Sequence, residues 1–201
     1  VSPTPTQTPT STPTPTFTPT PTPVPPTPFI MDGDLDDDVP LIISHGKRSL
    51  YVKRDGNWLY IATEVTTTTL QDQFIFIANE PGEMRGGPWA KSGQIAQWSS
   101  YAGRESQNNW TGWFDASGSE SYSASKTGGY FETVINLQDR FGSIPPWIYL
   151  CVTVFETWNE GNLLHELQIP SPVFINGNVE SEEYLRFSLL NEWKPNGFMV
   201  H

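Results

Sequence analysis

The sequence has a single cysteine, few cations and no long hydrophobic run. The lone Cys151 excludes an internal disulfide and any zinc site built from several cysteines. Eleven lysines and arginines stand against 22 acidic residues, and a net charge of −11 disfavours binding to nucleic acid or to anionic lipid. No apolar run reaches the ~18 residues that a membrane-spanning helix needs. The sequence therefore predicts neither a nucleic-acid partner nor insertion into a membrane.

Charged side chains are also absent from residues 1–28, which consist almost wholly of threonine and proline. This segment holds 11 of the 19 prolines, together with 11 threonines. It offers too few apolar side chains to bury a core, and proline favours the extended polyproline II conformation. We therefore divide the chain into an extended Thr/Pro-rich arm or linker, residues 1–28, and a globular domain, residues 29–201.

Three roles for the arm remain open. It can be a solvated spacer, or a stalk with O-linked glycans, since Ser/Thr-rich segments with proline are typical acceptors outside the cell. It can also be an assembly arm, because Thr-Pro alternation leaves the remaining N–H groups on one edge, free to pair with a sheet of a neighbouring copy. The second role predicts an extracellular or cell-surface location and glycosylation at Thr4, Thr6, Thr8, Thr10, Thr12, Thr14, Thr16, Thr18, Thr20, Thr22 and Thr27. The third predicts a homo-oligomer or polymer with the apolar anchors Phe17, Val24, Phe29 and Ile30.

The globular part is β almost throughout. Residues 50–54 and 57–64 read as a hairpin around Asp55-Gly56, a pair that suits the positive φ of tight hairpin turns. Residues 147–156 are apolar on both faces, which is typical of a central strand. Only residues 136–141 indicate a helical turn. Further strands are predicted at residues 73–78, 94–98, 110–114, 130–136, 163–168 and 184–190. The expected fold is all-β, a two-sheet antiparallel sandwich in one domain.

Several short motifs resemble a known group of domains. The opening Met31-Asp-Gly-Asp-Leu-Asp36, the strand Asn57–Ala62 and the segment Tyr130–Leu137 are similar to family-9 carbohydrate-binding modules and DOMON domains. The segments Phe74–Ala78, Pro88–Gly93 and Glu105–Phe114 resemble a variant of that group in secreted bacterial proteins. The resemblance covers about residues 29–190. It implies a jelly-roll-like sandwich outside the cytoplasm, usually without catalytic activity.

Tryptophan is abundant, with eight residues in the chain. Five of them lie in or beside loop signals, where an indole ring could stack on a sugar face or pack in a subunit interface. Trp110-Thr-Gly-Trp113 follows Asn108 and Asn109, and such a mixture of rings and amides suits a sugar site. The candidate carbohydrate or interface aromatics are Trp89, Trp98, Trp110, Trp113 and Trp158.

The densest charge cluster lies between residues 32 and 38. Carboxylates at alternate positions, Asp32, Asp34 and Asp36, are oxygen ligands of the kind that Ca²⁺ prefers. The spacing departs from an EF-hand, because Asp37 stands where glycine is required and Ile43 where the bidentate glutamate belongs. The alternative is an ordinary turn whose carboxylates cap local N–H groups. Apart from this possible Ca²⁺, no cofactor is predicted.

Catalysis is not predicted. The three histidines are scattered, and no nucleophile elbow, zinc-protease helix or phosphate-binding loop occurs. The leading interpretation is a non-enzymatic secreted subunit of an extracellular filament or sheath, whose arm contacts neighbouring subunits. The alternative is a carbohydrate-binding module joined through a Thr-Pro linker to an enzyme or surface protein, with a polysaccharide as its partner. An adhesin domain shares both sets of features.

Overall fold

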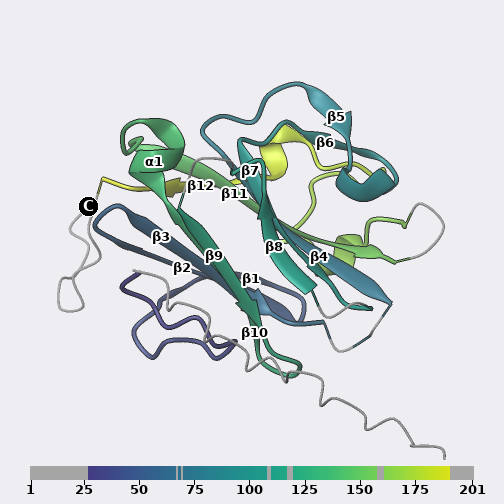
Figure 1. The fold of residues 1–201 in the computed structure, drawn as a ribbon. Helices are drawn as coiled ribbons and strands as arrows, with labels where there is room; N and C mark the ends of the chain where they lie inside the picture. The colour runs from purple at the N-terminus through teal and green to yellow at the C-terminus, as the bar shows by residue number, and fades with distance from the viewer. Residues whose placement is uncertain are drawn as a thin grey trace, which may run out of the picture.

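The computed structural model describes residues 27–66, 68, 70–107, 110–116, 120–157 and 161–190. These residues form the predicted antiparallel β-sandwich, with two five-stranded sheets packed face to face (Figure 1). The first sheet has the order β1 (Leu41–His45), β2 (Arg48–Asp55), β3 (Trp58–Glu64), β10 (Tyr130–Asn136) and β9 (Ser121–Ser125). The second sheet has the order β12 (Leu185–Ser188), β11 (Trp147–Glu156), β4 (Gln71–Ala78), β7 (Ser100–Glu105) and β8 (Trp110–Phe114).

The local signals of the sequence explain most of these strands. The β2–β3 hairpin turns at Asp55-Gly56, where Gly56 has φ 55° as the turn requires. The apolar strand β11 lies between β4 and β12 and is buried along most of its length, which confirms the prediction of a central strand. The two sheets enclose the main core, whose largest members include Leu50, Ile61 and Phe131.

Some strand predictions were wrong. Residues 163–168 make a single bridge, between Leu163 and Phe155, and then turn into the 3-10 helix η2 (His165–Leu167) instead of forming a strand. Four strands were not predicted, because their segments are short or rich in serine and glycine rather than in large β-forming residues. They are β1, β5 (Met84–Gly86), β7 and β9.

Residues 29–39 cover the outer face of the first sheet. Phe29 is only 6% exposed, and its ring lies 4.9 Å from that of Tyr60 on β3. The Thr27 hydroxyl accepts a hydrogen bond from the Phe29 N–H at 3.0 Å. Phe29 is therefore not an anchor for a neighbouring subunit, because its own domain already buries it. Ile30 is exposed, whereas Phe17, Val24 and the threonines from Thr4 to Thr22 lie outside the described residues.

The outer face of the second sheet is covered as well. The two-stranded ribbon of β5 and β6 (Gln94–Ala96), with the 3-10 helices η1 (Pro88–Ala90) and η3 (Ser181–Glu183) near its ends, packs over a second core. That second core is rich in aromatic residues, among them Phe74, Phe76 and Tyr101. It leaves the edge strand β8 only partly covered, so this edge is where side chains are available to a ligand.

The helix α1 (Leu137–Phe141) and the β5–β6 ribbon lie at the same, upper end of the sandwich in Figure 1. Asn136 caps the start of the helix, where its side chain accepts hydrogen bonds from the N–H groups of Gln138 and Asp139, and Gly142 with φ 73° caps its end. This confirms the predicted helical turn. No helix in the described part of the chain has the length and apolar character that crossing a bilayer demands.

Candidate functional site

A pair of glycines forms the floor of an aromatic surface at the edge of the second sheet. Gly103 on β7 and Gly112 on β8 are cross-strand partners. An ideal Cβ at Gly103 would lie 3.0 Å from the Trp89 ring, and one at Gly112 would collide with the Trp110 ring. Both indoles can therefore lie close to the sheet only because neither glycine carries a side chain.

Trp89 is held in an unusual backbone conformation. It lies in η1 with φ 54° and ψ 37°, in the left-handed region that bulky residues rarely adopt. Strain of this kind costs on the order of 1–3 kcal/mol and persists where the surrounding contacts enforce it, often at functional sites. Here it brings the Trp89 ring to within 5.7 Å of Trp110 and 5.3 Å of Phe114, centroid to centroid.

The three rings and Glu105 line an open hollow of about 440 Å³, which we call the aromatic hollow. Trp89 is 37% exposed and Trp110 is 39% exposed, although most large aromatic side chains of this sheet are buried. Glu105 is the cross-strand partner of Trp110, so a carboxylate stands at one end of the aromatic walls. The hollow thus combines exposed ring faces with an acceptor of hydrogen bonds.

The segment that carries Trp89 is fixed to the sheet by a buried ion pair. Lys91 follows η1, and its Nζ lies 2.8 Å from the Asp72 carboxylate on β4, with both side chains almost fully buried. The same Nζ donates to the carbonyl of Glu156 at 2.8 Å, and Asp72 also accepts from the Ser106 N–H at 3.3 Å. A buried charge pair with these additional hydrogen bonds holds one geometry, which fixes the chain where it leaves the strained turn.

The structure separates the five candidate tryptophans. Trp89 and Trp110 come together in the hollow, and Trp98 is buried nearby, at 8% exposure. Trp113 is on the opposite face of β8, where it packs against the main core and donates its Nε1–H to the Tyr122 carbonyl at 2.8 Å. Trp113 is therefore partly buried against the main core and is not part of the hollow. Trp158, Asn108 and Asn109 lie outside the described residues.

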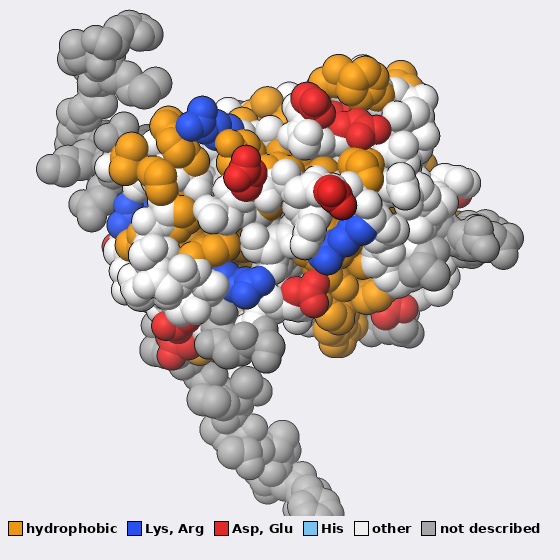
Figure 2. Space-filling model, turned by 90° about the horizontal axis from the view of Figure 1, so that it is seen from above, with side chains coloured by type: hydrophobic (Ala, Val, Ile, Leu, Met, Phe, Trp, Pro, Cys, Tyr) orange, Lys and Arg blue, Asp and Glu red, His pale blue; other side chains and the backbone are white. Residues whose placement is uncertain are grey.

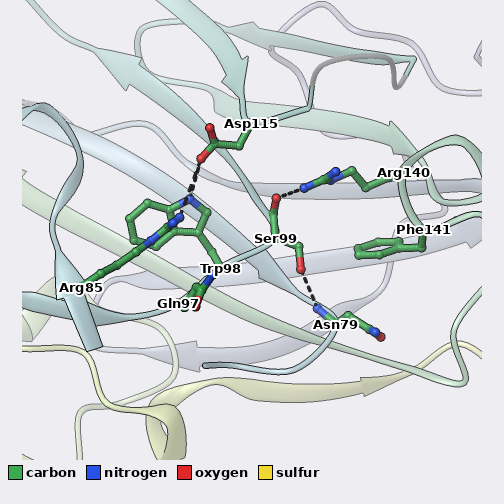
Figure 3. Close-up of a pocket in the computed structure, with 8 residues that line it drawn as sticks. All are labelled: Asn79, Arg85, Gln97, Trp98, Ser99, Asp115, Arg140 and Phe141. Carbon is green, nitrogen blue, oxygen red and sulfur yellow. Dashed lines mark hydrogen bonds and ion pairs between the residues drawn. The ribbon is translucent and has the colours of Figure 1, made fainter. Parts of the chain in front are cut away.

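A second pocket, of about 600 Å³, lies between the β5–β6 ribbon and α1, and we call it the arginine pocket (Figure 3). The Arg85 guanidinium lies over the Trp98 ring, 3.3 Å from its centroid. The Arg140 guanidinium donates to the Ser99 carbonyl from the other side. The pocket is lined by Asn79, Arg85, Gln97, Trp98, Ser99, Asp115, Arg140 and Phe141.

Asp115 links the arginine pocket to the aromatic hollow. Its carboxylate accepts a hydrogen bond from Trp98 Nε1 at 3.0 Å and lies 3.7 Å from Arg85 Nη2. It directly follows Phe114, whose ring stacks on Tyr101 at 4.9 Å, and Tyr101 in turn contacts Trp98 at 5.4 Å. Among the described residues other than glycine, positive φ occurs only at Trp89 and Asp115, one in each pocket. Each pocket thus contains one non-glycine residue with positive φ, which aspartate adopts more readily than tryptophan.

The acidic opening loop is organised around a buried carboxylate. Glu132 on β10 is fully buried and accepts hydrogen bonds from the N–H groups of Asp32 and Gly33 and from the Tyr60 hydroxyl. Burial raises the pKa of the Glu132 carboxyl to about 7, although the hydrogen bonds from Tyr60 and Gly33 favour its charged form. The loop at residues 31–36 is therefore fastened to the sheet through its backbone.

The three candidate calcium ligands make local contacts. Asp32 caps the N–H of Asp34 at 2.9 Å, Asp36 accepts weakly from the Ile30 N–H, and Asp34 pairs with Lys126. In the part of the chain that the structure describes, no group of three or more acidic, histidine or cysteine side chains is placed to hold a metal ion. The contacts fit the turn-capping alternative, and the calcium site stays a prediction.

The surface at the upper end of the sandwich is chemically mixed. In the view from above, hydrophobic side chains form several patches separated by polar atoms and by charged side chains of both signs (Figure 2). Such a mixture is typical of protein surfaces, and the described residues form no single broad apolar area on this face.

Comparison with known proteins gives little further guidance. No family model matches the sequence, and no curated protein matches it. Among solved structures, the chain is similar to a family-9 carbohydrate-binding module from Caldicellulosiruptor kristjanssonii in complex with cellotriose. The sequences are 15% identical over 69% of this chain and 77% of that one, with a TM-score of 0.39.

Proposed function

We propose that this domain is a non-catalytic carbohydrate-binding module whose aromatic hollow holds a polysaccharide. The observation that carries the proposal is the strained Trp89, which stands with Trp110 over the Gly103–Gly112 floor. A fold tolerates such strain and such exposure of large rings where a ligand benefits from them. One side of the Trp89 ring packs edge-on against Phe74 of the second core at 4.9 Å, and the ring still remains 37% exposed.

The chemistry of the hollow matches a sugar ring. The C–H faces of a pyranose carry partial positive charge and stack on the negative faces of aromatic rings. Trp89, Trp110 and Phe114 offer such faces at centroid separations of 5.2–5.7 Å, and Glu105 offers oxygen acceptors for hydroxyl groups. Ligand sites typically combine mostly apolar walls with a few polar groups in this way.

The arm takes the role of a linker in this proposal. Residues 1–28 would tether the module, outside the cell, to an enzyme or to another surface protein. The filament interpretation depended on an arm that anchors neighbouring subunits, and Phe29, one of its four anchors, is buried in its own domain. We therefore favour the sugar-binding role over the structural one.

The proposal is tested by affinity electrophoresis of the full chain in gels that contain soluble polysaccharides. Retention of the native chain and its loss in Trp110→Ala are expected. Trp58→Ala is the matched control, because Trp58 lies on the first sheet with its ring 6.1 Å from Tyr122, away from both pockets. Retention that Trp110→Ala leaves unchanged would remove the hollow as the binding site.

A further inference from the structure

We infer that the arginine pocket binds a negatively charged group, a carboxylate or a sulfate ester, on the polysaccharide that the aromatic hollow holds. This inference rests on the proposed function and adds the class of sugar. The chain carries only 11 lysines and arginines against 22 acidic residues. Two of its arginines nevertheless converge on one pocket from elements 55 residues apart in sequence, Arg85 on β5 and Arg140 on α1 (Figure 3). Asp115 is the only acidic side chain among the lining residues, so the pocket is locally cationic.

Both guanidinium groups are positioned in advance of any ligand. Stacking on Trp98 holds the Arg85 guanidinium flat, and the Ser99 carbonyl holds one Nη of Arg140. The Nε of each arginine is buried, so a ligand can meet only the Nη groups, and the Arg85 side chain is 38% exposed. The Nη groups of a guanidinium recognise carboxylate and sulfate oxygens through charge-assisted hydrogen bonds. Holding it in place beforehand reduces the entropy lost when the ligand binds.

Asp115 does not cancel this preference. Its carboxylate is already engaged by Trp98 Nε1 at 3.0 Å, and its 3.7 Å separation from Arg85 is longer than a charge-assisted hydrogen bond. Its role is to orient the indole on which Arg85 lies. One of the two positive charges then remains without a neutralising carboxylate among the residues that line the pocket.

The anion is part of a sugar chain because of where the pocket lies. Trp110 opens β8 and Asp115 follows its last residue, so the two are about 17 Å apart along an extended strand. Beneath the surface, the ring contacts of Phe114 with the buried Tyr101 and Trp98 join the two sites into one packed unit. A sugar chain lying along β8 would stack on the indoles at one end and place a charged substituent between the arginines at the other. Asn79 and Gln97 would contact its hydroxyl groups.

Non-specific attraction does not explain such binding, because a protein of charge −11 repels polyanions. At physiological salt, charges more than about 8 Å apart are largely screened from each other. Contacts inside the pocket are shorter than this and are screened much less. The preference for an acidic sugar should therefore depend on these two arginines and not on the total charge.

The test measures binding of the full chain to polygalacturonate and to its methyl ester by calorimetry in 0.15 M salt. The free acid is expected to bind at least about tenfold more tightly, the effect of one charge-assisted contact. Arg140→Gln and Arg85→Gln should abolish that ratio, so that the acid and the ester bind about equally to each variant. Arg186→Gln is the matched control, because its guanidinium also stacks on an indole, 4.0 Å from Trp147, outside the pocket. A sulfated glucan as third polymer tells whether the preferred anion is sulfate or carboxylate.

The outcomes separate the two proposals. Equal binding of acid and ester by the native chain, with no tighter binding of the sulfated glucan, overturns the anion inference and leaves the sugar-binding function standing. The same follows if a preference for the acid survives in both arginine variants. The opposite result is also distinguishable. Galacturonate alone would change the chemical shift of Trp98 Nε1–H and Arg140→Gln would remove that change, while Trp110→Ala would not alter the binding of any polymer. In that case the anion pocket stands and the hollow fails.

Discussion

The Trp110 indole lies directly on Gly112, two residues along the same strand, so that a Cβ at Gly112 would be 2.3 Å from its Cζ2 atom. Real side chains do not approach so closely, and Gly112→Ala would therefore push the ring off the sheet. The backbone of Gly112 does not have positive φ, so alanine is tolerated by the chain itself. We expect loss of polysaccharide retention with a folded domain, measured by gel retention and far-UV circular dichroism.

Gly86→Ala is the control for this change, because a Cβ at Gly86 would meet nothing within 4 Å. It should bind as the native chain does. Full retention by Gly112→Ala would show that the position of the Trp110 ring does not matter for binding.

The opening segment gives a prediction about stability. Phe29 is buried against Tyr60, whereas its neighbour Ile30 is 64% exposed. Phe29→Ala should lower the free energy of unfolding by about 3 kcal/mol, since it removes a buried ring and leaves a cavity. Ile30→Ala should change it by less than about 0.5 kcal/mol. Urea denaturation of both variants measures this difference, and equal effects would contradict the burial of Phe29 in its own domain.

Glu132 predicts a dependence of stability on pH. Its pKa is about 7 in the folded state, against 4.5 for an ordinary glutamate. The folded state therefore holds the proton more tightly, so the contribution of this group to stability is full below pH 4.5 and is lost as the pH rises to about 7. The loss from this group is on the order of 3 kcal/mol.

Glu132→Gln isolates that contribution, because the amide imitates the protonated acid and can keep its partners. Urea midpoints of both proteins between pH 4.5 and 8 should diverge as the pH rises, with the variant changing less. Parallel curves would mean that Glu132 does not titrate in this range.

The buried ion pair below the hollow predicts a different effect. Lys91→Met leaves the Asp72 carboxylate buried without its cation, which should cost about 3–5 kcal/mol and loosen the turn that carries Trp89. Unfolding should therefore occur at lower urea, and sugar binding should weaken. Lys126→Met removes a solvent-exposed pair with Asp34 and should leave both properties unchanged. Two variants of equal stability would show that the Lys91 pair does not fix the turn.

Much of the fold could be predicted from local signals. The hairpin at Asp55-Gly56 and the apolar strand at residues 147–156 have patterns that depend on neighbouring residues alone, and both were found as expected. Strands β7 and β9 could not be predicted this way. Their short sequences, rich in serine, alanine and glycine, become strands because β4, β8 and β10 lie beside them and complete their hydrogen bonds.

The sequence by itself determined that the chain is an acidic, aromatic-rich β-domain with a threonine-proline arm, because composition and alternation are local properties. It also pointed to Trp89 and Trp110. Only the tertiary structure decided that these two meet, that Trp113 faces the core, and that Arg85, Asp115 and Arg140 share a pocket. The physical reason is that strand register and the packing of the β5–β6 ribbon and α1 at the upper end bring together residues from distant segments. Contacts between such distant segments leave no signal in the local sequence pattern.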